Sequence, residues 1–205
     1  MINQMRSVAF LMALLAAALV LACGDDPVKP PVACSSCSQN LTHKTDVLSN
    51  IEYAYNRQQT NVYDALLDDA FTFFYTEGDV GGGTVVQWGR DVESSATAGL
   101  LGAASSIDLD ITWEDGVTWI EVPAGAETWY STTVFYHFLF KIGDTIYIPN
   151  SGAKAEFTVR NTGTDEKPHW MLVEFTDLGG PSLVSVLERT STSSTSWGKV
   201  KALYR

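Results

Sequence analysis

The sequence is poor in basic residues, histidine and cysteine. Its 205 residues include 13 Lys and Arg against 24 Asp and Glu, a formal net charge of −11. Such a surface repels phosphate backbones, so no nucleic-acid partner is expected. The three His are far apart, with no HExxH spacing, and no serine lies in a GxSxG motif. A metal site, a cofactor and a hydrolase nucleophile are therefore not predicted.

Apolar and aromatic residues are plentiful. Hydrophobic residues make up 45% of the chain, with 6 Trp, 8 Tyr and 9 Phe. This composition excludes a disordered chain, and the length suits one domain with a sizeable core.

The longest apolar run is short and lies at the N-terminus. Fifteen residues from Val8 to Ala22 follow a single charge, Arg6. A membrane-spanning helix needs about 20 residues, so this run predicts a cleaved secretory leader. The run ends at Val20-Leu21-Ala22-Cys23. One interpretation is an ordinary signal peptide whose cleavage site happens to lie near a Cys.

That end also resembles the lipobox of bacterial lipoproteins. The resemblance implies cleavage before Cys23, acylation of Cys23 and attachment to the membrane through the N-terminal acyl chains. It predicts an extracytoplasmic, membrane-anchored lipoprotein of the cell envelope, at the outer membrane if the cell is Gram-negative.

The predicted organisation has four segments. Residues 1–22 are the signal peptide, 23–44 the lipidated Cys and a Pro/Ser-rich tether, 45–178 the folded domain, and 179–205 a Ser/Thr-rich extension with a docking segment. In an oxidising compartment Cys34 and Cys37 are expected to form a structural disulfide. A thiol redox site, free thiols and intermolecular pairing are the alternatives. In the docking segment, Lys199, Lys201 and Arg205 are expected to face an acidic surface or solvent.

Hydrophobic periodicity predicts three helices followed by a mostly β region. The helices are expected over residues 45–58, 60–69 and 91–104. The strands are expected over residues 70–76, 107–113, 117–122, 129–142, 145–148, 154–161 and 169–175.

This order, with IEYAYNRQQTNVYDALLDDAFTFFYT (51–76) and HWMLVEFTD (169–177), resembles the nuclear-transport-factor-2-like (cystatin-like) superfamily. The resemblance implies an α+β fold with about three N-terminal helices on a strongly curved antiparallel sheet. It also implies a conical pocket between the helices and the concave sheet face, and commonly a homodimer through the convex face. It implies no single activity, because this fold hosts enzymes, binding modules and assembly domains.

The candidate site residues follow from that pocket. The residues expected to line it are Tyr53, Tyr55, Phe73, Trp113, His137 and Trp170. The candidate catalytic groups are Asp69, His137 and Glu174. Each also has a non-catalytic interpretation. The Asp68-Asp69 pair would mark a helix end, His137 would be a hydrogen-bonded strand residue, and Glu174 would be a solvated carboxylate.

The missing catalytic pattern favours a non-catalytic module that binds a small apolar ligand or another envelope protein. Two alternatives stay open. One is an isomerase, dehydratase or cyclase that uses a pocket carboxylate or His with a tyrosine, and the other is a structural dimerisation module. A dry pocket with a carboxylate hydrogen-bonded to a phenol would favour the enzyme. A filled cone with a flat hydrophobic outer sheet would favour the dimerisation module.

Overall fold

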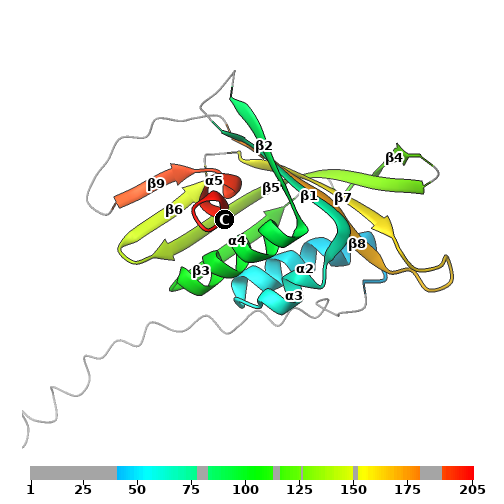
Figure 1. Cartoon of the computed structure of the whole chain (residues 1–205), viewed down its shortest axis with the longest axis horizontal. Helices are drawn as coiled ribbons and strands as arrows, with labels where there is room; N and C mark the ends of the chain where they lie inside the picture. Colours follow the sequence, from blue (N-terminus) through cyan, green and yellow to red (C-terminus); the bar gives the residue numbers. More distant parts are fainter. Residues whose placement is uncertain (1–40, 78–82, 113–115, 126, 150–151, 181–190) are drawn as a thin grey trace, which may run out of the picture. The chain divides into compact units, whose positions relative to one another are not determined.

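The computed structural model describes residues 41–77, 83–112, 116–125, 127–149, 152–180 and 191–205 (Figure 1). Cys23, Cys34, Cys37 and Trp113 lie outside these residues.

Three helices lie together on one side of the sheet (Figure 1): α2 (Lys44–Asn56), α3 (Thr60–Asp64) and α4 (Arg90–Ala103). α2 begins where the His43 backbone N–H donates to Asp46 Oδ2 at 2.8 Å, which satisfies an amide at the helix start. Its apolar face buries residues at helical spacing, among them Leu48, Ile51 and Tyr55. Among the described helices, none combines the length and hydrophobicity needed to cross a bilayer.

The described strands form one curled sheet in the order β2-β1-β8-β7-β5-β6-β9, with β3 and β4 also paired to β5. They are β1 (Leu67–Glu77), β2 (Thr84–Gly89), β3 (Ser106–Thr112), β4 (Ile120–Ala124), β5 (Glu127–Ile142), β6 (Thr145–Pro149), β7 (Lys154–Asn161), β8 (Trp170–Gly179) and β9 (Ser191–Thr195). The long strand β5 pairs with β7 and then β6 along one edge, and with β4 and then β3 along the other.

The sheet is mixed, which corrects the antiparallel sheet expected from the sequence. β1 runs parallel to β8, and β6 runs parallel to β9. The hairpin partners β5 and β6, and β7 and β8, are antiparallel because a short connection allows only that direction. β1 and β8, like β6 and β9, are far apart in the chain, so no tight turn sets their direction.

The second predicted helix is shorter than expected. α3 ends at Asp64 and β1 begins at Leu67, so Asp68 and Asp69 lie in a strand and do not mark a helix end. Leu67 pairs with Leu172 of β8, so the chain joins the sheet at this point and does not continue the helix. Strands β2 and β9 were not predicted from the pattern. β9 is the Ser/Thr-rich stretch, whose backbone pairs with the edge of β6.

The core lies between the helices and the inner face of the sheet. Its largest buried side chains are aromatic. Tyr55 and Tyr63 come from helices, and the strands contribute Phe73, Phe138, Phe140, Phe157 and Phe175. A last short helix, α5 (Trp197–Ala202), packs against α4, β1 and β8 and adds Trp197 to this core.

Candidate functional site

A buried carboxylate, Glu93 of α4, lies in the interior between the helices and the sheet. Glu93 has no exposed surface. Its Oε1 accepts hydrogen bonds from Tyr63 OH at 2.5 Å and Thr97 Oγ1 at 3.2 Å, and its Oε2 accepts one from Trp88 Nε1 at 2.8 Å. Thr97 is one helical turn after Glu93, while Tyr63 and Trp88 reach it from α3 and β2. These neutral donors satisfy the oxygens of the carboxylate without neutralising its charge.

The positive charge comes from Lys201 of α5. Lys201 is also fully buried, and its Nζ donates to Glu93 Oε1 and, at 3.3 Å, to Tyr63 OH. Burial lowers the pKa of Lys201, and the negative charge of Glu93 opposes that change. The result is a buried ion pair between the last helix and the middle of the chain.

Five aromatic rings surround this ammonium group, and we call them the aromatic cage. Their centroids lie 4.4 to 5.8 Å from Lys201 Nζ, within the range of cation–π attraction. The cage consists of Tyr55, Tyr63, Phe73, Phe175 and Trp197. Four of its members belong to the body of the domain, and Trp197 arrives on α5 with the lysine.

The phenols of the cage are held in their neutral form. Burial, and secondly the charge of Glu93, raise the pKa values of Tyr55 and Tyr63 well above the usual value of 10.0. Tyr63 therefore acts as a hydrogen-bond donor to Glu93 at any physiological pH.

A second buried carboxylate, Asp177 of β8, holds the start of α5. Its Oδ2 accepts from the Gly198 backbone N–H at 2.6 Å, and its Oδ1 accepts from Tyr136 OH at 2.7 Å. A Cβ atom at Gly198 would lie only 2.5 Å from Tyr75 Cβ. Glycine at this position is therefore what lets α5 approach the sheet closely.

The fit of α5 leaves one polar atom without a partner. The Trp197 ring lies edge-on to Tyr55 and Phe175, with centroids 5.0 and 4.8 Å away. Its buried indole Nε1 has no hydrogen-bond partner within the described part of the chain. A buried donor left unpaired costs about 1–3 kcal/mol, so α5 sits in the interior without full polar satisfaction.

The structure brings two of the expected pocket residues, Tyr55 and Phe73, into the aromatic cage. Tyr53 is half-buried elsewhere on α2. Trp170 lines a surface groove of about 440 Å³ with Trp119 and the start of α2, where Lys44 Nζ lies 3.4 Å from the centroid of the Tyr130 ring.

The candidate catalytic groups are not brought together. Asp69 is 95% exposed and pairs with Arg90. His137 is exposed on the outer face of β5, opposite Asp110 of β3, and so does not line the interior. Glu174 is half-buried on the same outer face, beside Thr158. Burial, and secondly the charge of Glu156, raise the pKa of Glu174.

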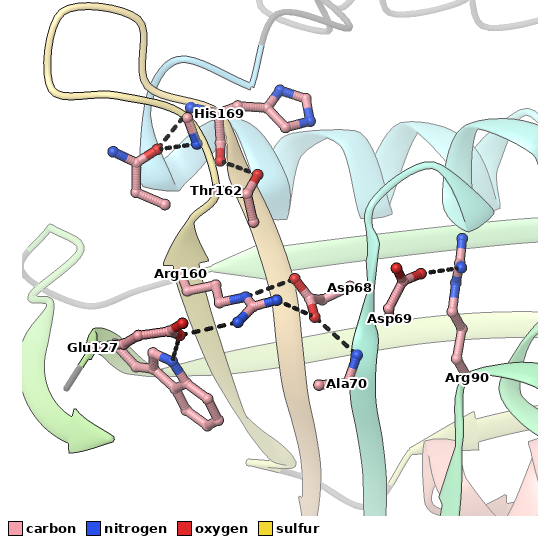
Figure 2. Close-up of polar contacts among 11 residues, drawn as sticks. Asp68, Asp69, Ala70, Arg90, Glu127, Arg160, Thr162 and His169 are labelled. Carbon is pink, nitrogen blue, oxygen red and sulfur yellow. Dashed lines mark hydrogen bonds and ion pairs between the residues drawn. The ribbon is translucent and has the colours of Figure 1, made fainter. Parts of the chain in front are cut away.

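Another polar cluster joins β1, β5 and β7 (Figure 2). Arg160 donates two hydrogen bonds to the buried Asp68, from Nε at 2.7 Å and from Nη2 at 2.9 Å, and a third from Nη1 to Glu127 Oε2 at 3.0 Å. Asp68 also accepts from the Ala70 backbone N–H at 2.8 Å. Because Asp68 accepts hydrogen bonds from both β7 and its own strand, this cluster cross-links the strands.

Glu93 and Lys201 are the two site residues that the sequence interpretation did not single out. Glu93 shares a helix face with Ala96, Thr97 and Leu100, so an acid on the apolar face was a readable signal. Lys201 follows Trp197 by one helical turn and lies on its buried side, which corrects the expected acidic surface or solvent contact. The carboxylate that it meets lies on another helix, and no local pattern shows that. In the described ranges, no group of three or more His, Cys, Asp or Glu side chains is placed to hold a metal ion.

Comparison with known proteins finds similarity at the level of structure. No family model and no curated protein matches the sequence. A candidate scytalone dehydratase from Novosphingobium aromaticivorans aligns with a TM-score of 0.48 at 9% identity, over 72% of this chain and 89% of that one. An NTF2-like protein of unknown function in nutrient uptake from Rhodospirillum rubrum aligns with a TM-score of 0.47 at 14% identity, over 68% and 98%. A candidate dehydratase of the NTF2-like family from Streptomyces avermitilis aligns with a TM-score of 0.45 at 16% identity, over 67% and 92%.

Proposed function

We propose that this chain is a membrane-anchored extracytoplasmic lipoprotein whose folded body is a nuclear-transport-factor-2-like ligand-binding module. The leader of residues 1–22, followed directly by Cys23, supports the anchor. Helices packed on one face of a curled, mixed sheet with a long central strand support the fold. Cone-like interiors of this kind suit small ligands, because they are concave, aromatic and supplied with a few polar groups.

One observation carries the binding role: the interior is occupied by a side chain from the last helix of the chain. Glu93 and four of the five cage rings belong to residues 55–175, so the body builds the chamber and α5 fills it. α5 spans only Trp197–Ala202 and enters with an unsatisfied indole N–H. In this proposal the ligand takes the place of α5.

Gly198→Ala tests whether the chamber can open, because it pushes α5 away from Tyr75 and leaves the four cage residues of the body unchanged. We expect faster amide exchange in α5 and saturable binding of the cationic dye thioflavin T, whose positive charge can balance Glu93, with cooperative unfolding retained. The matched control is Gly102→Ala on α4, where an added Cβ meets nothing within 4 Å. A folded Gly198→Ala protein with α5 released but no dye binding would contradict the chamber.

The lipid anchor has its own test. The intact mass of detergent-extracted protein should show loss of residues 1–22 and added acyl chains, and Cys23→Ala should abolish both. An intact mass that retains the leader without acylation would exclude the proposed anchor.

A catalytic function is the second candidate, and the Glu93–Tyr63 hydrogen bond of 2.5 Å favours it. A buried carboxylate and a phenol are the base and the proton donor that enolisation uses. In the described structure Glu93 is paired with Lys201 and is not free to act as a base. Binding is therefore the leading proposal. The test is deuterium uptake by cyclohexanone with the Gly198→Ala protein. Loss of that uptake in the Gly198→Ala/Glu93→Gln variant would establish catalysis, and no uptake in either would leave binding.

The dimerisation alternative has less support. The face of the sheet opposite the helices carries polar side chains on adjacent strands, including Glu174, Thr158, Glu156 and Ser131. A filled interior together with a flat hydrophobic outer face would have favoured assembly, and only the filled interior is found.

A further inference from the structure

We infer that the ligand of this chamber is a primary alkylammonium ion, whose place Lys201 takes in the described structure. The inference rests on the proposed function of the chamber, and it names the ligand class from the groups that contact Lys201 Nζ.

The first argument is charge. Glu93 is fully buried, and its partners other than Lys201 are the neutral donors Tyr63, Thr97 and Trp88. A buried carboxylate without a counterion is strongly unfavourable, so an occupant that displaces α5 and leaves Glu93 ionised must bring a positive charge. A neutral or anionic ligand would force Glu93 to take up a proton.

The second argument is the wall of the chamber. The rings of Phe73 and Phe175 lie 4.4 and 4.5 Å from Lys201 Nζ, and both remain in place when α5 leaves because they belong to β1 and β8. Aromatic faces attract a desolvated cation, and their apolar surface also suits an alkyl chain.

The third argument distinguishes a primary from a quaternary ammonium. Lys201 Nζ donates to two acceptors, Glu93 Oε1 and Tyr63 OH. A primary ammonium carries three N–H donors and can repeat both contacts. A quaternary ammonium has no N–H and would leave both oxygens without that donor.

The test uses the mature full-length chain with Lys201→Ala, which removes three methylene groups and the ammonium. n-Propylammonium replaces the missing atoms. We expect Lys201→Ala to lose thermal stability and n-propylammonium chloride to restore most of it in a saturable way. n-Propanol, tetramethylammonium chloride and sodium chloride at equal concentration should restore none of it. Equal rescue by n-propanol, or no rescue by the amine, would overturn the inference.

Two variants control the experiment. Lys201→Met keeps an unbranched apolar side chain in the chamber, so n-propylammonium should not stabilise this variant. Stabilisation equal to that of Lys201→Ala would show a non-specific effect and overturn the inference. Glu93→Gln/Lys201→Ala removes the charge requirement and should abolish the response to the amine, whereas retention of the response would also overturn it.

If Lys201→Ala does not fold by itself, refolding provides the readout. Recovery in n-propylammonium but not in n-propanol supports the inference, and recovery in neither or in both overturns it. The failure of this inference differs from that of the proposed function. Dye binding to Gly198→Ala without amine rescue keeps the chamber and rejects the ligand class, whereas absent dye binding rejects the chamber itself.

Discussion

Asp68 and Asp69 are neighbours in the sequence, and β1 turns them to opposite environments (Figure 2). The side chain of Asp68 is 2% exposed and binds Arg160 through two hydrogen bonds, while that of Asp69 is 95% exposed and makes one contact with Arg90. The alternation of side chains along a strand produces this difference. The two ion pairs therefore form a natural comparison.

Arg160→Ala should destabilise the protein far more than Arg90→Ala. Removal of Arg160 leaves Asp68 buried without its counterion, which typically costs about 3–5 kcal/mol. Removal of Arg90 affects an exposed pair worth about 0–1 kcal/mol. Urea unfolding of both variants measures the difference, and equal losses would show that Asp68 does not depend on Arg160.

Glu174→Gln should stabilise the protein at pH 7 and not at pH 4. Burial, with the nearby charge of Glu156, raises the pKa of Glu174 above its ordinary value of 4.5. The folded state therefore binds this proton more tightly than the unfolded state. That contribution to stability is fully present below pH 4.5 and is lost as pH rises through the folded pKa.

The gain from Glu174→Gln, measured as the shift in urea midpoint, should thus shrink as pH falls toward 4.5. Glu166→Gln, at an exposed position in the loop between β7 and β8, is the control substitution and is measured at the same pH values. A gain in stability that is constant with pH would contradict a raised pKa of Glu174 in the folded state.

Trp197→Ala should cause a large loss of stability. Trp197 is fully buried against Tyr55 and Phe175, and truncation of a buried aromatic residue costs about 3–5 kcal/mol. Leu203→Ala is the control, because Leu203 is 63% exposed beyond the same helix. Thermal melting compares the two, and a loss at Leu203 as large as that at Trp197 would show that burial is not the cause.

Glu93 and Lys201 should be strongly coupled. Glu93→Gln and Lys201→Met each leave one buried charge unpaired, and each is expected to cost about 3–5 kcal/mol. The double variant removes both charges and should recover much of that loss, because a buried ion pair can often be replaced by neutral residues at little cost. A double-mutant cycle in urea measures the coupling, and additive losses would contradict the pair.

Local pattern was sufficient for most of the elements. The structure has α2 at Lys44–Asn56 and α4 at Arg90–Ala103, close to the helices expected over 45–58 and 91–104, and β7 at Lys154–Asn161 as expected. Strong periodicity over a long segment is a local property, and the chain displays it directly. The end of α3 and the strands β2 and β9 depend on pairing with distant segments, and propensity alone missed them.

The sequence by itself determined the acidic surface, the α+β order of elements and the amphipathic faces of α2 and α4, because composition and periodicity are properties of neighbouring residues. Only the tertiary structure decided the parallel pairing of β1 with β8, the opposite environments of Asp68 and Asp69, and the meeting of Lys201 with Glu93. Lys201 and Glu93 are 108 residues apart, and the packing of α5 against α4 and the sheet is what brings the ammonium to the carboxylate.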